Sequence, residues 1–151
     1  MPHAPTMAAA HPAFVAYAIT CLILCLNLLA LWISSGASRA KGGVAINPED
    51  GARYGVPVSE IDPPHVARIL RAHRNAEATI YPFLLLGLLF LLSEGSAAFA
   101  IPVFAIFVVA RLVHSIVYLK GLQPWRTIAF AASLLALVVL TGGVIYNLVF
   151  N

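Results

Sequence analysis

The feature that most constrains this chain is a series of four long apolar stretches, near residues 13–34, 67–92, 97–119 and 126–149. Each is long enough to cross a hydrocarbon core of about 30 Å, which takes roughly 20 helical residues. The composition agrees, because 61% of the residues are hydrophobic and only 10% are charged, against about 25% charged in soluble proteins. The sequence therefore predicts an all-α membrane protein, with residues 1–151 forming one four-helix transmembrane bundle.

The charged residues indicate how the bundle is oriented. A charge at the bilayer centre costs at least about 2.5 kcal/mol, so charged side chains should lie in loops and at helix ends. All nine Lys and Arg residues fall on one side of the predicted topology, in or beside the hydrophilic loop 35–62 and the connection near 120–125. By the positive-inside rule that side is cytosolic. We expect a multi-pass protein of the bacterial inner membrane, or of the endoplasmic reticulum in a eukaryote.

Loop 35–62 and the helix after it carry further signals. A hydrophilic loop of about 30 residues is usually functional. Asp62 precedes Pro63 and Pro64, a pattern typical of an N-cap followed by prolines in the first helical turn. The helix therefore starts before the membrane, and its first turns should stand outside the hydrocarbon.

Polar side chains gather in the cytosolic half of three predicted helices. At about 100° per residue, Arg71, Arg74 and Asn75 share one broad face of the second helix. Glu77 can pair there with Arg74 at i, i+3 or with His73 at i, i+4. The remaining polar residues of this half are Arg111, His114 and Tyr118 in one stripe of the third helix, and Arg126 and Thr127 at the start of the fourth.

Two interpretations of these residues compete. Arginines near helix ends can simply reach lipid phosphate, and Arg68 fits that interpretation. Asn75, His114 and Tyr118 add uncharged donors and acceptors that lipid phosphate does not require, so a polar pocket is the more economical explanation. Arginine binds a carboxylate through two parallel hydrogen bonds. Several arginines at the cytosolic side therefore favour a small, acidic, cytosolic ligand.

Other classes of ligand find no support in the sequence. No basic run or aromatic-interleaved patch favours nucleic acid as a partner. Cys21 and Cys25 are too few for a metal site and are interpreted as packing residues.

Two segments carry a resemblance to a known family. These are RAHRNAEATIYPF at 71–83 and RLVHSIVYL at 111–119, supported by NPED at 47–50 and by Arg126-Thr127. The chain resembles the membrane-associated proteins in eicosanoid and glutathione metabolism, and most of all their isomerase branch. The resemblance implies a homotrimer that holds glutathione between helices of adjacent subunits, near the cytosolic face.

The resemblance also implies roles for individual residues. Arg126 and Thr127 would activate the glutathione thiol, and Asp50 would act as an acidic partner of Arg126. The expected glutathione contacts are Arg39, Arg71, Arg74, Asn75, Glu77, His114, Tyr118 and Arg126.

Two positions depart from the pattern. Ala78 stands where the family has glutamate, and Glu77 is rotated from that position by about 100°. Phe130 replaces a tyrosine of the isomerase branch.

The expected function is therefore glutathione-dependent. The thiol would be used on lipophilic electrophiles or peroxides arriving from membrane lipid, by transfer, by peroxide reduction or by isomerisation of an endoperoxide. One alternative is a non-catalytic protein that binds lipid or glutathione. A transporter or channel subunit is less well supported, because such proteins place polar groups near the bilayer midplane.

Overall fold

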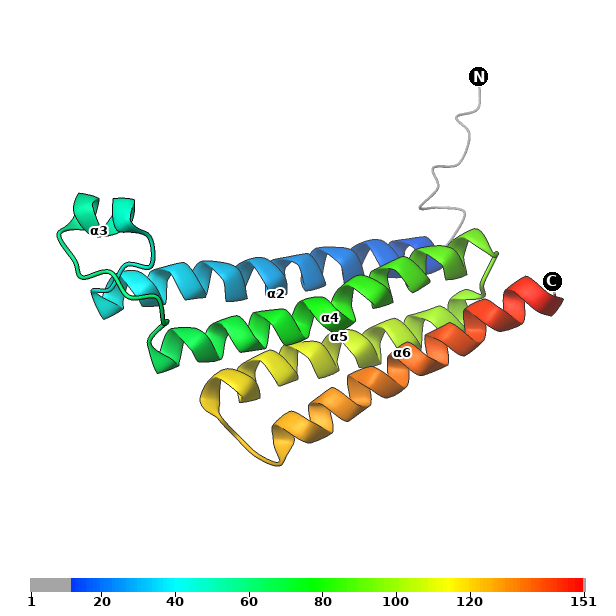
Figure 1. Ribbon diagram of the computed structural model, residues 1–151. Coiled ribbons are helices and arrows are strands. Elements are labelled where there is room, and N and C mark those ends of the chain that lie inside the picture. The colour runs from blue at the N-terminus through cyan, green and yellow to red at the C-terminus, as the bar shows by residue number, and fades with distance from the viewer. Residues whose placement is uncertain (1–11, 151) are drawn as a thin grey trace, which may run out of the picture.

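The protein is a bundle of four long helices, seen in a computed structural model that describes residues 12–150 (Figure 1). All four are long and apolar enough to cross a membrane, which confirms the predicted all-α membrane fold. Residues 1–11 and 151 of the expected domain lie outside the described part. The four helices are α2 (Pro12–Gly42), α4 (Pro64–Leu92), α5 (Ala97–Lys120) and α6 (Trp125–Phe150).

The segment expected to be a loop, residues 35–62, is shorter and more ordered than the hydropathy pattern suggests. Helix α2 continues to Gly42, because the polar residues after the apolar stretch include good helix formers. The helix stops before Gly43, which has the positive φ of 60° that glycine tolerates best. A short helix, α3 (Pro48–Tyr54), follows with Pro48 in its first turn.

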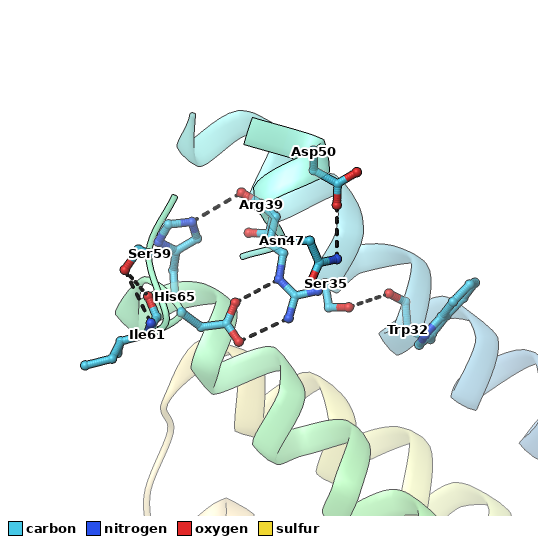
Figure 2. Close-up of polar contacts among 10 residues, drawn as sticks. Trp32, Ser35, Arg39, Asn47, Asp50, Ser59, Ile61 and His65 are labelled. Carbon is cyan, nitrogen blue, oxygen red and sulfur yellow. Dashed lines mark hydrogen bonds and ion pairs between the residues drawn. The ribbon is translucent and has the colours of Figure 1, made fainter. Parts of the chain in front are cut away.

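The start of α4 also differs in detail from the sequence interpretation. Pro63, not Asp62, is the N-cap residue, and no side chain caps the helix. The Asp62 carboxylate instead accepts from Arg39 Nε at 2.8 Å and from Arg39 Nη2 at 3.1 Å. This bidentate pair joins the end of α2 to the start of α4. His65 Nε2 lies 3.4 Å from the Ser38 carbonyl oxygen in the same region (Figure 2).

Aromatic side chains fill the centre of the bundle. Phe83 of α4 stacks on Phe107 of α5, with ring centroids 3.6 Å apart. Tyr17 of α2 donates to the Leu84 carbonyl oxygen at 3.0 Å. At Gly87 the helices α2 and α4 approach so closely that a Cβ atom there would lie 2.9 Å from Tyr17 Cε2. Large apolar side chains cover the outside of the bundle, as a lipid-facing surface requires.

Most of the charged residues and the connecting segments α2–α4 and α5–α6 lie at one end of the bundle. Here α2 ends, α4 begins, α5 ends and α6 begins, and α3 stands beside the end of α2 (Figure 1). We call this the basic end, because the Lys and Arg residues lie at it or in the adjoining half of the helices. The opposite end consists of the tight turn between α4 and α5 and the C-terminal part of α6.

Candidate functional site

A polar cleft of about 300 Å³ opens at the basic end between three helices. Helix α4 contributes one side chain to it, α5 two and α6 three. Its lining residues are Asn75, His114, Tyr118, Arg126, Thr127 and Phe130. All six were singled out in the sequence, and five of them as contacts or catalytic groups.

The α5 side of the cleft is aromatic. The His114 and Tyr118 rings meet edge to face with centroids 5.5 Å apart, and Phe130 lies 6.1 Å from His114. His114 is only 2% exposed, and its Nδ1 atom has no hydrogen-bond partner among residues 12–150. A buried ring nitrogen without a partner is costly.

A buried arginine stands directly behind the cleft. Arg111 is 0% exposed, and its Nη2 donates to Asn75 Oδ1 at 3.0 Å. A longer contact of 3.5 Å joins Nη1 to Ser133 Oγ, and Ser133 in turn donates to the Phe130 carbonyl oxygen. Because Arg111 occupies the Asn75 oxygen, the amide nitrogen of Asn75 remains as a donor. Asn75 therefore suits an acceptor atom of a ligand.

The start of α6 presents a cation and a hydroxyl side by side. The Arg126 guanidinium carbon lies 4.9 Å from the centroid of the Tyr118 ring, a distance at which the ring face attracts a cation. Thr127 Oγ1 lies 3.0 Å from one end of the Gln123 side-chain amide. This end of α6 combines a fixed positive charge with a hydroxyl, the groups suited to stabilising an anion.

The α4 residues other than Asn75 do not line the cleft. Arg71 and Arg74 are exposed on the surface of the helix. Glu77 pairs with His73 Nδ1 at 3.4 Å, one of the two pairings considered from sequence, and accepts from Tyr81 at 3.2 Å. Glu77 is two positions after Asn75, which turns their side chains about 200° apart.

Arg39 and Asp50 lie in a different part of the chain. They line a second cleft, of about 590 Å³, formed by the end of α2, by α3 and by the residues around them. Asn47 donates to Asp50 there at 3.2 Å, and Figure 2 shows both residues close to Arg39. Within one chain, then, the expected site residues fall into two clefts and an exposed helix face.

Two residues of the site were not assigned to it from sequence. Arg111 was placed in the polar stripe of the third helix but not among the expected contacts, although a cation deep in an apolar helix is functional or paired by default. Gln123 gave no signal, because an exposed glutamine between two helices is unremarkable without the contacts it makes.

Comparisons with known proteins show which family the chain belongs to. The MAPEG family model matches residues 17–146. The chain is 34% identical to prostaglandin E synthase of Homo sapiens over 128 residues, which cover 84% of each protein. It is 37% identical to microsomal glutathione S-transferase 1 of Mus musculus over 127 residues, covering 78% of this chain and 77% of that protein. Both the match to the family model and the identity to these relatives place this chain in the MAPEG family.

Proposed function

We propose that this protein is a glutathione-dependent transferase or isomerase of the membrane, acting on lipophilic electrophiles. One observation carries the proposal, which is the convergence of Asn75, His114, Tyr118, Arg126 and Thr127 on one cleft. The relatives are a prostaglandin E synthase and a glutathione S-transferase by name, and this supports the assignment. The protein spans the membrane several times, so a lipophilic substrate can reach it from the bilayer.

The cleft residues suit the parts of glutathione, a tripeptide with two carboxylates, an amine, two amide groups and a thiol. The Asn75 amide nitrogen is free to donate to a peptide carbonyl. Tyr118 and His114 offer further polar groups beside it. Arg71 lies on the face of α4 that carries Asn75, one turn closer to the basic end. Arg71 and Arg74 have the reach to bind carboxylates at the cleft mouth.

A second subunit completes the site in this proposal. A cleft of about 300 Å³ is at the lower limit of ligand pockets, which span about 300–1,000 Å³. Arg39 and Asp50 lie in the other cleft of their own chain. In a homotrimer, α2 and α3 of a neighbouring subunit would bring Arg39 to the ligand and Asp50 to Arg126. The complete site would then lie between subunits at the cytosolic face of the membrane.

Chemistry begins at the start of α6. An ordinary thiol has a pKa of about 8.5 and is mostly protonated at neutral pH. Arg126 and the Thr127 hydroxyl donate hydrogen bonds to the sulfur, which favour the thiolate as the S–H proton leaves to solvent. The sulfur electron pair then forms a bond to the electrophilic atom of the substrate, and the leaving group departs with its own electrons. Lowering the thiol pKa by one unit takes about 1.4 kcal/mol, which one charge-assisted bond supplies.

Isomerisation and peroxide reduction use the same activated sulfur. In both cases the sulfur attacks one oxygen of the O–O bond, and the other oxygen leaves with the bonding electrons and takes up a proton. In peroxide reduction a second glutathione thiol then attacks the sulfur, which gives glutathione disulfide and releases the first oxygen as an alcohol. In isomerisation a base removes the proton from the carbon that carries the sulfur-bound oxygen, the C–H electrons form the carbonyl, and the S–O bond breaks to return the thiolate. Phe130 lines the cleft without a hydroxyl group, so its wall offers one donor fewer than a tyrosine would. We propose transfer and peroxide reduction as the main activities, with isomerisation of endoperoxides as an accompanying capability.

A turnover assay separates this proposal from a non-catalytic binding protein. The purified full-length protein in detergent micelles is mixed with glutathione and a chromogenic aryl halide. We expect saturable turnover that falls at least tenfold in Arg126→Ala. Glutathione binding without turnover on aryl halide, hydroperoxide or endoperoxide substrates would contradict catalysis. Absence of glutathione binding would contradict the proposal as a whole.

A further inference from the structure

Gln123 lies in the short connection between α5 and α6 and touches both residues proposed to activate the thiol. Its side chain is exposed to solvent and sits one helical turn before Thr127. In the α5–α6 connection, residues 121–124, it is the side chain whose polar atoms face both Arg126 and Thr127. An amide has an acceptor oxygen and a donor nitrogen, so its orientation decides what each neighbour receives.

One orientation of the Gln123 amide opposes its neighbours. In it, the Thr127 hydroxyl donates to the amide oxygen at 3.0 Å. The amide nitrogen then faces the Arg126 guanidinium, so donors face donors. The single hydroxyl proton of Thr127 is also consumed, because a hydroxyl has only one proton to give.

The other orientation satisfies all three side chains. The Gln123 oxygen accepts from Arg126 Nη2 at 2.7 Å and from Arg126 Nε at 3.1 Å, while the amide nitrogen donates to Thr127 Oγ1 at 3.0 Å. Amide orientation is assigned from such networks, and this network selects the second orientation. Thr127 now receives a hydrogen bond, and its own proton is free to point into the cleft.

We propose that Gln123 is a positioning residue for thiol activation. Its oxygen holds the Arg126 guanidinium in place, and its nitrogen donates to Thr127 Oγ1, so that the proton of that hydroxyl points into the cleft. The inference rests on the proposed glutathione-dependent function. It adds that the Gln123 amide nitrogen, by donating to Thr127 Oγ1, orients this hydroxyl so that its proton points toward the sulfur. Arg126 keeps three of its five N–H donors for ligand and neighbouring groups.

Two substitutions separate the two halves of this role. Gln123→Leu removes both the acceptor for Arg126 and the donor to Thr127. Gln123→Glu retains an acceptor for Arg126 but has no donor, so its carboxylate accepts the hydrogen bond of the Thr127 hydroxyl. Both changes should raise the pKa of the bound glutathione thiol, by about one unit for Gln123→Leu. The negative charge of Gln123→Glu should raise it at least as far.

The readout is the pH dependence of kcat together with the ultraviolet absorbance of the bound thiolate. At neutral pH we expect kcat to fall about tenfold in Gln123→Leu. The rate should recover toward that of the wild type once the pH exceeds the raised thiol pKa. A glutathione KM within about twofold and an unchanged thermal midpoint should accompany this loss. A purely structural role for Gln123 would instead lower kcat equally at every pH.

A double-mutant cycle with Thr127→Ala tests the mechanism of the coupling. If Gln123 acts partly by freeing the Thr127 proton, Gln123→Leu should cost less in the Thr127→Ala background than in the wild type. Leu122→Ala in the same connection is the matched control and should leave the thiol titration unchanged. If the effects of the two substitutions on the thiol pKa are fully additive, the proposed orientation of the Thr127 hydroxyl by Gln123 is wrong.

The same experiment distinguishes the inference from the function on which it rests. A wild-type protein that forms the thiolate while Gln123→Leu titrates identically would overturn only the role of Gln123. A wild-type protein that binds no glutathione, or forms no thiolate with it, would remove the proposed function first.

Discussion

Arg111 is a buried charge that bonds a residue of the cleft without lining the cleft itself. Its guanidinium is fully enclosed, yet it bonds the oxygen of Asn75. Replacing Arg111 by an apolar residue of similar size removes the cost of burying its charge as well as its bond to Asn75, so the two effects on stability oppose each other. The loss should therefore appear in binding, because an unrestrained Asn75 amide can rotate its donor away from the cleft.

The corresponding prediction concerns Arg111→Met. We expect glutathione affinity to fall about tenfold, equivalent to about 1.4 kcal/mol, as measured by titration calorimetry in detergent. Arg68→Met is the control, since Arg68 is exposed at the start of α4. Equal affinities of the two variants would mean that Arg111 does not hold Asn75 in its binding orientation.

A second comparison at the residue scale separates two neighbours on α4. Asn75 lines the cleft, whereas the Glu77 carboxylate is engaged by His73 and Tyr81 on another face. We expect Asn75→Ala to weaken glutathione binding about tenfold and Glu77→Ala to change it less than twofold. A larger loss in Glu77→Ala would show that this acid contacts glutathione, as the family resemblance implies.

At the scale of elements, the Arg39–Asp62 pair is the clamp that holds the 43–61 segment between α2 and α4. Both oxygens of Asp62 are bonded, and the two side chains are 35% and 17% exposed. A planar guanidinium and a carboxylate matched in this way make a stronger bond than an ordinary surface ion pair. The clamp should keep α3 in place beside α2.

Limited proteolysis tests the clamp. Arg53 is an exposed trypsin site within α3. In Asp62→Ala we expect cleavage after Arg53 to accelerate several-fold, because the segment opens more often. Glu60→Ala removes a nearby exposed carboxylate and should cleave at the rate of the wild type. Equal rates in all three proteins would show that the clamp does not restrain the segment.

The elements also show what the sequence can and cannot predict. Apolar stretches predicted the four membrane helices well, because lipid demands length and hydropathy. The predicted end of the first helix was too early, since Arg39 and Lys41 are hydrophilic but still helical. The N-cap assigned to Asp62 was wrong, because a side chain 23 positions away competed for its carboxylate. Hydropathy carries no information about such a long-range partner.

For the site, too, the sequence predicted some features and could not predict others. Helical spacing placed His114 and Tyr118 in one stripe, and the structure brings both to the cleft together with residues of α4 and α6. Spacing could not show that Gln123 meets Arg126 and Thr127, because that depends on how the chain turns between α5 and α6. Nor could it show that Arg39 and Asp50 lie in a separate cleft.

At the scale of the whole molecule, Arg39 and Arg126 line different clefts of one chain, and this arrangement allows a test of the homotrimer. If Arg39 acts on the cleft of a neighbouring subunit, inactive Arg39→Ala and Arg126→Ala chains should complement each other when co-expressed. In random mixed trimers with cyclic symmetry, about a quarter of the sites would contain both intact residues. Recovered activity near that fraction supports a shared site. No recovery in trimers shown to contain both chains would place the complete site within one subunit.

The most direct test of the central claim is the ultraviolet difference spectrum of glutathione bound to the purified full-length protein at neutral pH. If the cleft activates the thiol, the wild type should show thiolate absorbance, and Arg126→Ala should lose most of it while keeping its thermal midpoint. Bound glutathione that shows no thiolate absorbance in the wild type, or the same absorbance in both proteins, would contradict the assignment of thiol activation to this cleft.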